Sequence, residues 1–428
     1  MKQASAANMV SEKTKPSSLL ASLYPQLLYT ASGFTGKNPF LELGSREQAR
    51  AALKSGQALR QLQRGLTGDR DFAGAAYFSK HELSSAYLLY YWPVSFLQTS
   101  LALDELTARG YLPKLGSVLD LGAGPGPASA AAVLRGAKTL LLLDKSKEAL
   151  RQALSILEAQ ALGARQPPSG KAILSSSVID LELLKRLPEG PFDLILACHS
   201  ANELWKQDTD ALEKRARLFG QAIERLTEGG ILIIIEPSAL VTSRPALSLR
   251  NRLLEDFAGR LSCVAPCPGS FPCPILASGE GRSCHSTWVW EPNEPVAALA
   301  AAAGLDRDSV KATWFALKKN SQHTQSPYDT TVRSSTSFQQ RKNSIFGRVI
   351  SEPLLNKAGR LRYILCTESG LATFSAKAID DKDSAGGFFS LRRGDMIEAA
   401  HLELREGDNN FGFIAGSKLK IAMKAPEA

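Results

Sequence analysis

The chain has 428 residues, 44% of them hydrophobic, which is enough for two or three domains with ordinary cores. No apolar run approaches the roughly 18 residues that span a bilayer, so we expect no membrane partner. Residues 1–18 lack the apolar core of a secretory signal. This predicts a cytoplasmic location, or a mitochondrial one if the source is eukaryotic.

The net charge of +9 is concentrated in one stretch of the chain. Between residues 310 and 365 only two acids, Asp329 and Glu352, accompany ten basic residues. The ten are Lys311, Lys318, Lys319, Arg333, Arg341, Lys342, Arg348, Lys357, Arg360 and Arg362. Such a cluster favours a nucleic-acid partner, and a solvated basic face is the alternative.

Residues 1–110 are expected to form an arm and a helical cap. The first 45 residues contain one short apolar helical pattern, at 19–28, and longer helical patterns follow at 51–66 and 83–106. Aromatic residues crowd the last of these: Tyr87, Tyr90, Tyr91, Trp92 and Phe96. We expect this aromatic face to pack on the next domain.

Residues 111–262 alternate between strand and helix patterns, which is typical of a parallel α/β sheet covered on both faces. Strands are predicted at 117–121, 139–144, 172–178, 192–198 and 230–236, and later helices at 208–226 and 245–261. Ligands of such sheets bind at the carboxyl ends of the strands, where the strand order reverses.

A glycine-rich loop follows the first of these strands, in the run Val-Leu-Asp-Leu-Gly-Ala-Gly-Pro-Gly at 118–126. The spacing is G-x-G-x-G, and Pro127 stands where a dinucleotide fingerprint has its third glycine. Asp144 ends the next strand, where a carboxylate can receive ribose hydroxyls. The combination predicts an S-adenosylmethionine site in a class I (Rossmann-like) sheet. A glycine-rich turn in another α/β protein is the alternative.

Eight residues are candidates for binding this donor: Asp120, Gly122, Ala123, Gly124, Gly126, Asp144, Asp180 and Ala197. Asp120 is expected to orient the loop, and Asp180 to lie near the adenine. Asn202 and Glu203 are candidates for the acceptor pocket. No catalytic residue is identified, because we expect Cys198 to be a buried structural thiol.

Four of the six cysteines lie in a Pro- and Gly-rich stretch: Cys263, Cys267, Cys273 and Cys284. Their spacing differs from that of a zinc ribbon and leaves an iron–sulfur cluster, zinc and no metal open. We assign 263–318 to this metal segment and the end of the sheet, and 319–343 to a basic linker. Residues 344–428 are expected to form a small β module, OB-like, with strands at 347–350, 361–366, 371–376 and 396–402.

Several segments together resemble the methyltransferase-like family of mitochondrial small-ribosomal-subunit (Rsm-type) proteins and their bacterial relatives. They are the glycine loop, Ala-Cys-His-Ser-Ala-Asn-Glu-Leu at 197–204 and Gly-Gly-Ile-Leu-Ile-Ile-Ile-Glu-Pro at 229–237. The series continues with Val-Ala-Pro-Cys-Pro at 264–268, Pro-Cys-Pro at 272–274, Cys-His at 284–285 and Leu-Cys-Thr at 365–367. The cysteine series is the specific part.

The resemblance implies a methyltransferase fold that acts on, or is bound to, small-subunit ribosomal RNA. It also implies a [4Fe–4S] cluster with Cys267, Cys273, Cys284 and Cys366 as ligands. A local set that includes Cys263 is the second choice, and zinc is the alternative metal. The alternative function is a non-catalytic ribosome assembly factor that keeps the fold for RNA binding. We expect a monomer.

Overall fold

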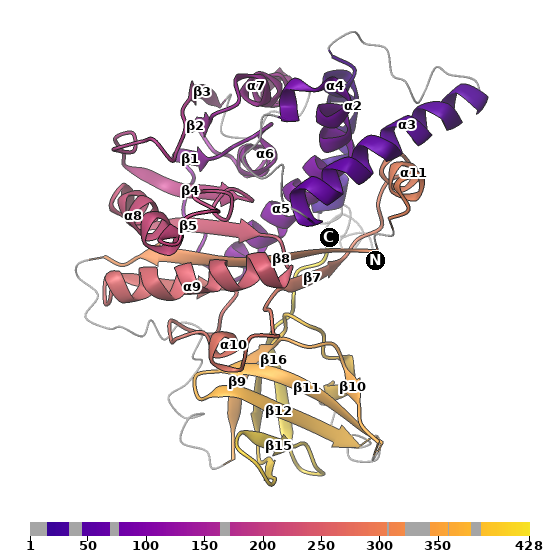
Figure 1. The fold of residues 1–428 in the computed structure, drawn as a ribbon. Coiled ribbons are helices and arrows are strands. Elements are labelled where there is room, and N and C mark those ends of the chain that lie inside the picture. The colour runs from indigo at the N-terminus through magenta and orange to yellow at the C-terminus, as the bar shows by residue number, and fades with distance from the viewer. Residues whose placement is uncertain are drawn as a thin grey trace, which may run out of the picture.

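The computed structural model describes residues 15–33, 45–68, 77–162, 172–305, 308–321, 343–357, 359–377 and 387–428. Most of the expected arm and of the expected linker, with Arg333, Arg341 and Lys342, lies outside these residues. The described residues form two sheets, and helices cover both faces of the first (Figure 1). No helix among them is long and apolar enough to cross a membrane.

The first sheet has the strand order β3-β2-β1-β4-β5-β8-β6, with β7 paired to β8. Its strands are β1 (Ser117–Leu121), β2 (Thr139–Asp144), β3 (Ile173–Val178), β4 (Phe192–Cys198), β5 (Leu226–Glu236), β6 (Leu261–Ala265), β7 (Ser286–Val289) and β8 (Ser309–Lys319). The first five are parallel and have the order of a doubly wound fold. The expected α/β sheet is confirmed, but it is mixed, because β8 runs antiparallel to β5, β6 and β7.

Helices connect these strands and precede them. The N-terminal set is α2 (Pro16–Ala31), α3 (Ser45–Gln63), α4 (His81–Ala86), the π-helical turn η3 (Tyr87–Tyr91) and α5 (Trp92–Ala108), with short turns η1 (Arg64–Gly68) and η2 (Tyr77–Ser79). The sheet helices are α6 (Pro127–Val133), α7 (Lys147–Leu162), α8 (Ala211–Glu224), α9 (Leu240–Asp256), α10 (Pro274–Ala277) and α11 (Glu294–Ala303). Helix α9 begins five residues before the predicted start at Pro245, since the Ala239 carbonyl accepts from the Ser243 N–H at 2.7 Å.

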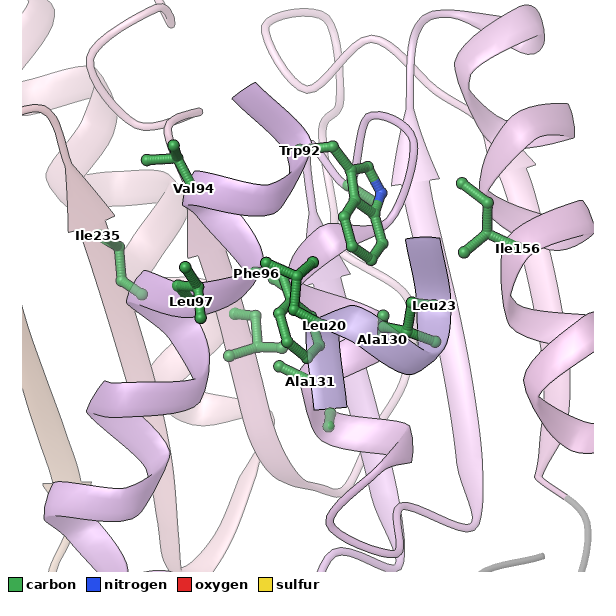
Figure 2. Packing of buried hydrophobic residues seen from close by; sticks show 14 of the residues in the cluster. Leu20, Leu23, Trp92, Val94, Phe96, Leu97, Ala130, Ala131, Ile156 and Ile235 are labelled. Carbon is green, nitrogen blue, oxygen red and sulfur yellow. The ribbon is translucent and has the colours of Figure 1, made fainter. Parts of the chain in front are cut away.

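The N-terminal helices bury an apolar face against the first sheet, as the aromatic pattern predicts. In Figure 2, Trp92, Phe96 and Leu97 of α5 lie beside the small residues of α6, with Leu20 and Leu23 of α2 nearby. Trp92 and Phe96 stack with ring centroids 5.5 Å apart, and both are fully buried. Helices α8 and α9 cover the opposite face with a second apolar cluster.

The second sheet has the order β14-β15-β12-β11-β9-β13-β16, with β10 paired to β11. Its strands are β9 (Ile345–Val349), β10 (Leu354–Leu355), β11 (Arg360–Thr367), β12 (Gly370–Lys377), β13 (Met396–Ala400), β14 (Glu403–Leu404), β15 (Asn410–Gly412) and β16 (Lys418–Met423). Phe374, Phe388 and Phe413 form the centre of its own core. The sheet lies on the side of α10 (Figure 1), and Cys366 of β11 packs there with Cys273 and Ile275.

Candidate functional site

A cavity of about 690 Å³ lies at the carboxyl ends of β1, β2, β4 and β5. Its volume suits a ligand of nucleoside size, and its position is the crevice in which doubly wound sheets bind ligands. Five of the predicted donor residues line it: Gly122, Ala123, Gly124, Asp144 and Asp180. These five residues come from the ends of β1 and β2 and from the loop after β3, so the cavity brings together predicted residues from three neighbouring strands.

The glycines of the loop serve three different purposes. Gly122 has φ +73°, and a Cβ there would meet the Cβ of Ser200 at 2.5 Å. Gly126, which directly precedes α6, has φ +76° and packs on Ala153 of α7, outside the cavity lining. Gly124 has φ +54°, and a Cβ there would have nothing within 4 Å. Gly124 is therefore the position at which bare backbone faces open space.

Asp144 holds this loop in place. Its Oδ2 accepts from the Gly124 N–H at 2.8 Å, and its Oδ1 accepts from the Ser146 N–H at 2.7 Å. Burial raises the pKa of Asp144, although these two hydrogen bonds oppose the shift. On the same side of the cavity, the Asp180 Oδ1 accepts from the Glu182 N–H at 3.0 Å.

Asp120 and Ala197 lie outside the cavity lining, at 1% exposure each. Asp120 Oδ2 accepts from the Ser129 hydroxyl at 2.7 Å, and its Oδ1 has no partner among the described residues. Burial raises the pKa of Asp120 to about 7. Its contact is therefore with the first turn of α6, behind the loop.

Helix α5 supports the loop from the other direction. The indole N–H of Trp92 donates to the Pro125 carbonyl at 2.9 Å. Because Trp92 is fully buried in the α5 packing, this bond ties the glycine loop to the N-terminal helices. The sequence shows an aromatic face here but no sign of this bond.

The end of β4 supplies Cys198, His199 and Ser200 to the cavity. The Cys198 thiol accepts from the Thr99 hydroxyl at 3.7 Å, and burial raises its pKa, which fits a structural thiol. Glu203 also lines the cavity. Asn202 does not, contrary to its expected place in the acceptor pocket: its amide donates to the Thr242 carbonyl at 2.6 Å.

His199 is a cavity residue that the sequence analysis missed. It has φ +58°, and its Nε2 lies 2.7 Å from Gln98 Oε1. Because the Gln98 amide nitrogen donates to the Lys311 carbonyl, Gln98 Oε1 must accept, so His199 Nε2 carries the proton. Burial lowers the pKa of His199 to about 4, which keeps the ring neutral at pH 7. Its Nδ1 is buried and has no partner among the described residues.

Aromatic residues line the cavity as well: Tyr77, Phe78, Tyr87 and Tyr91. Tyr87 and Tyr91 are the two ends of the π-helical turn η3. Sequence periodicity assigns Tyr87 and Tyr91 to an ordinary helix packed on the next domain. A π-helical turn has no clear periodic signal, so their role at the cavity was missed.

A second, small cavity of about 20 Å³ lies between the two sheets. The cysteines expected as metal ligands, Cys267, Cys273, Cys284 and Cys366, all line it. Across the part of the chain that the structure describes, no three His, Cys, Asp or Glu side chains are arranged to hold a metal ion as they stand. Cys263 does not line the cavity and instead neighbours Cys267, whose pKa is lowered by that thiol and by Arg250, Arg348 and Arg109.

Two buried arginines line the cysteine cavity. Arg250, 1% exposed, donates to the carbonyls of Phe271 at 3.0 Å and Gly269 at 2.9 Å. Arg348, 2% exposed, donates to the Ser286 hydroxyl at 2.7 Å. Within the described ranges neither has a carboxylate ion-pair partner. Buried cations are normally paired with an anion, so this cavity has an excess of positive charge.

Helix α9 lines both cavities. Thr242, in its first turn, lines the large cavity, while Leu247 and Arg250 line the cysteine cavity. Between them, the Ser243 hydroxyl donates to the Cys284 carbonyl at 3.1 Å. The two cavities therefore share one rigid element.

A family model described as the mitochondrial small ribosomal subunit Rsm22 matches residues 81–393. This is well over half of the chain. The chain belongs to the Rsm22 family. The resemblance to small-ribosomal-subunit proteins is thereby confirmed.

Similar proteins outside the family model include a ribosomal protein L11 methyltransferase of Geobacter sp. (strain M21), 30% identical over 152 residues. The match takes in 35% of this chain and 41% of that protein, so the chain spans less than half the length of this relative. A SAM-dependent methyltransferase of Leishmania major is 14% identical, with a TM-score of 0.33 over 63% of this chain and 82% of that one. A SAM-dependent O-methyltransferase of Thermotoga maritima is 15% identical, with a TM-score of 0.31 over 53% and 66%.

The Rsm22 match contains the glycine loop, the end of β4 and the four cysteines of the small cavity. Tyr77 and Phe78, which line the large cavity, precede it. The match ends at residue 393, within the segment that forms the second sheet. Most residues that line the two cavities of this Rsm22 protein therefore lie within the part of the chain that matches the family model.

Proposed function

We propose that this Rsm22 protein is an S-adenosylmethionine-dependent methyltransferase-like protein that acts on, or is bound to, small-subunit ribosomal RNA. One observation carries the donor assignment. The bare backbone at Gly124 and the carboxylates of Asp144 and Asp180 line a single cavity of about 690 Å³ at the switch in strand order. The protein would act wherever its small subunit is assembled, in a bacterial cytoplasm or in a mitochondrion.

Each of these residues has a defined task in binding the donor. Gly124 leaves room for the donor against the main chain, and Gly122 allows Ser200 to close the floor of the cavity. Asp144 has lone pairs left beside its two backbone bonds and accepts from the ribose hydroxyls. Asp180 accepts from the exocyclic amine of adenine. When bound, the donor supplies an activated methyl group, and alignment with the acceptor provides most of the rate enhancement.

Two observations favour the alternative function, a non-catalytic assembly factor. The Nδ1 of His199 is buried beneath the cavity surface, and the Cys198 thiol is engaged with Thr99. Neither group is therefore an exposed base or nucleophile. Calorimetry with S-adenosylmethionine, followed by primer extension on small-subunit RNA from a deletion strain, separates the two functions. Donor binding together with a missing modification supports the enzyme, and donor binding without one supports the assembly factor.

RNA binding is proposed from the charge of the second sheet. Lys357, Arg362, Lys377, Lys418 and Lys420 are exposed on its strands and turns. Contacts with phosphates release counterions, so the affinity for RNA should fall steeply with salt. A binding constant for small-subunit RNA that does not change with salt concentration would remove this part of the proposal.

We also propose that Cys267, Cys273, Cys284 and Cys366 hold a [4Fe–4S] cluster. The donor set fits such a group, since three thiols from the segment between β6 and β7 and one from β11 line one cavity. A thiolate-bound cluster carries negative charge, which would compensate the buried cations of Arg250 and Arg348. When bound, the cluster would cross-link the two sheets through four thiolate bonds.

Anaerobic purification with iron, sulfide and zinc analysis tests this assignment. We expect brown protein with about four irons per chain, the stoichiometry of this cluster type. A Cys263→Ser variant should keep its iron, because Cys263 lies outside the cavity lining. Colourless protein with one zinc per chain would replace the cluster with zinc. Loss of iron in Cys263→Ser would favour the local ligand set.

A further inference from the structure

The wall of tyrosines is the part of the large cavity that the proposed donor site does not explain. Tyr77 and Tyr87 lie with their ring centroids 5.9 Å apart, and Tyr87 and Tyr91 stack at 5.8 Å. All three rings line the cavity, and the π-helical turn η3 brings the last two to it. π-helical turns are rare and frequently occur at functional sites.

The charged groups around this wall are mostly anionic. Six carboxyl side chains line the cavity within the described residues, against two lysines, Lys145 and Lys311. The six are Asp144, Asp180, Glu182, Glu203, Glu236 and Asp308. His199 adds no positive charge, because burial keeps it neutral. The field in the cavity therefore favours a cation.

Tyr87 lines the same cavity as Asp144, at the end of β2, and Cys198, at the end of β4. Burial raises its pKa, and the nearby charges of Cys198, Glu203 and Asp144 raise it further. Burial likewise raises the pKa of Tyr77, with additional contributions from Tyr87, Glu203 and Asp144. Both phenols therefore stay protonated and neutral, and their ring faces remain electron-rich.

We infer that Tyr87, together with Tyr77 and Tyr91, makes the cavity select the positively charged sulfonium donor over its neutral thioether product, S-adenosylhomocysteine. The inference rests on the proposed donor site and adds a specificity to it. A cation over a desolvated aromatic face is stabilised by the ring quadrupole, and removing the methyl group removes the charge. The product then loses this interaction and leaves.

Calorimetry with three ligands tests this selection: S-adenosylmethionine, S-adenosylhomocysteine and sinefungin, an amine analogue that keeps the positive charge. We expect both cationic ligands to bind about tenfold more tightly than S-adenosylhomocysteine, the scale of a desolvated cation–π contact. Tyr87→Leu should reduce this ratio to near one by weakening the cationic ligands alone. Tyr87→Phe retains the ring and should retain the ratio.

Two further tyrosine variants extend the design. Tyr29→Leu, at a tyrosine of α2 that is 40% exposed and outside the cavity lining, is the control and should not change the ratio. Tyr91→Leu should lower the ratio as well, and it replaces Tyr87→Leu if that variant does not fold.

The outcomes separate this inference from the proposed function. Equal affinities of the wild type for all three ligands would overturn the selection but leave the donor site intact. A ratio that disappears in Glu203→Gln and persists in Tyr87→Leu would assign the selection to the carboxylate and overturn the role of the ring. Failure of every ligand to bind would overturn the donor site itself.

Discussion

Asp120 is a carboxyl group whose burial makes the protein sensitive to pH. Its pKa rises from 3.8 to about 7 on folding. The unfolded chain releases this proton near pH 4, whereas the native state keeps it, so stability falls as the pH rises from 4 to 7. The full difference is about 4 kcal/mol, since each pKa unit is worth about 1.4 kcal/mol. Asp120→Asn should remove this loss and be more stable than the wild type at pH 8.

Urea unfolding at pH 5 and pH 8 measures this effect. For the wild type, the urea concentration at the unfolding midpoint should be lower at pH 8 than at pH 5. For Asp120→Asn this decrease should be much smaller. Asp408→Asn, at an exposed turn of the second sheet, is the matched control and should behave like the wild type. An identical pH dependence of Asp120→Asn and wild type would show that Asp120 is ionised in the native state.

Gly122 and Gly124 should respond differently to the same added methyl group. In Gly124→Ala the methyl group enters open space, so the stability cost comes from the positive φ alone, at about 1–2 kcal/mol. The added methyl group also occupies the space proposed for the donor, so we expect the affinity of Gly124→Ala for S-adenosylmethionine to fall about tenfold or more. In Gly122→Ala the methyl meets Ser200 at 2.5 Å, so we expect a larger loss of stability. Thermal melting and calorimetry on both variants check this contrast.

The residues of the large cavity could be predicted only in part. Gly122, Gly124, Asp144 and Asp180 follow from the motif and from the ends of parallel strands. The same logic assigned Asp120 to the donor, but its side chain turns toward Ser129 behind the loop. Tyr77 and His199 come from other segments, and only the tertiary fold brings them to the cavity.

At the scale of elements, α5 is the support of the glycine loop. Trp92→Phe removes the indole donor to the Pro125 carbonyl, and a lost buried hydrogen bond costs about 1–3 kcal/mol. Because the loop is then held less firmly, we expect the donor affinity to fall several-fold. Phe96→Leu is the control: it perturbs the same core without touching the loop, so stability should fall while donor affinity is kept. Equal loss of affinity in both variants would contradict the role of this bond.

Element positions were predictable where the local pattern is strong. The strands at 117–121, 139–144 and 192–198 match the structure to the residue. The first is followed by Gly122, the second ends at Asp144 and the third ends before His199, so a polar residue or a glycine ends each apolar run. The direction of β8 was not predictable, because a single apolar strand carries no sign of its partner. The sequence pattern likewise predicts one long helix through the π-helical turn η3, because both conformations bury similar faces over a few residues.

At the scale of the whole molecule, Cys366 connects the second sheet to the first. It lies on β11 and is buried beside Cys273 and Ile275. If its thiolate is a metal ligand, Cys366→Ser should weaken the attachment of the second sheet. We expect faster amide hydrogen exchange in β9 and β11, with little change in β1 or β4.

Cys263→Ser is the control for this experiment, because Cys263 lies on β6 and outside the cysteine cavity. It should leave exchange in β9 and β11 unchanged. Unchanged exchange in Cys366→Ser as well would argue against a bond across the two sheets. Removal of the metal from the wild type should reproduce the Cys366→Ser pattern if the cluster makes this connection.

Helix α9 has a consequence for how occupants of the two cavities affect each other. Thr242 borders one cavity, Arg250 borders the other, and Ser243 is bonded to Cys284 between them. A ligand that shifts this helix from one cavity changes the binding free energy at the other. Thermodynamic linkage makes this coupling free energy the same in both directions. If chelation weakens donor affinity by some factor, saturating donor must strengthen metal retention by that same factor. This Rsm22 fold would then couple iron status to methyl-donor status through a single helix, α9.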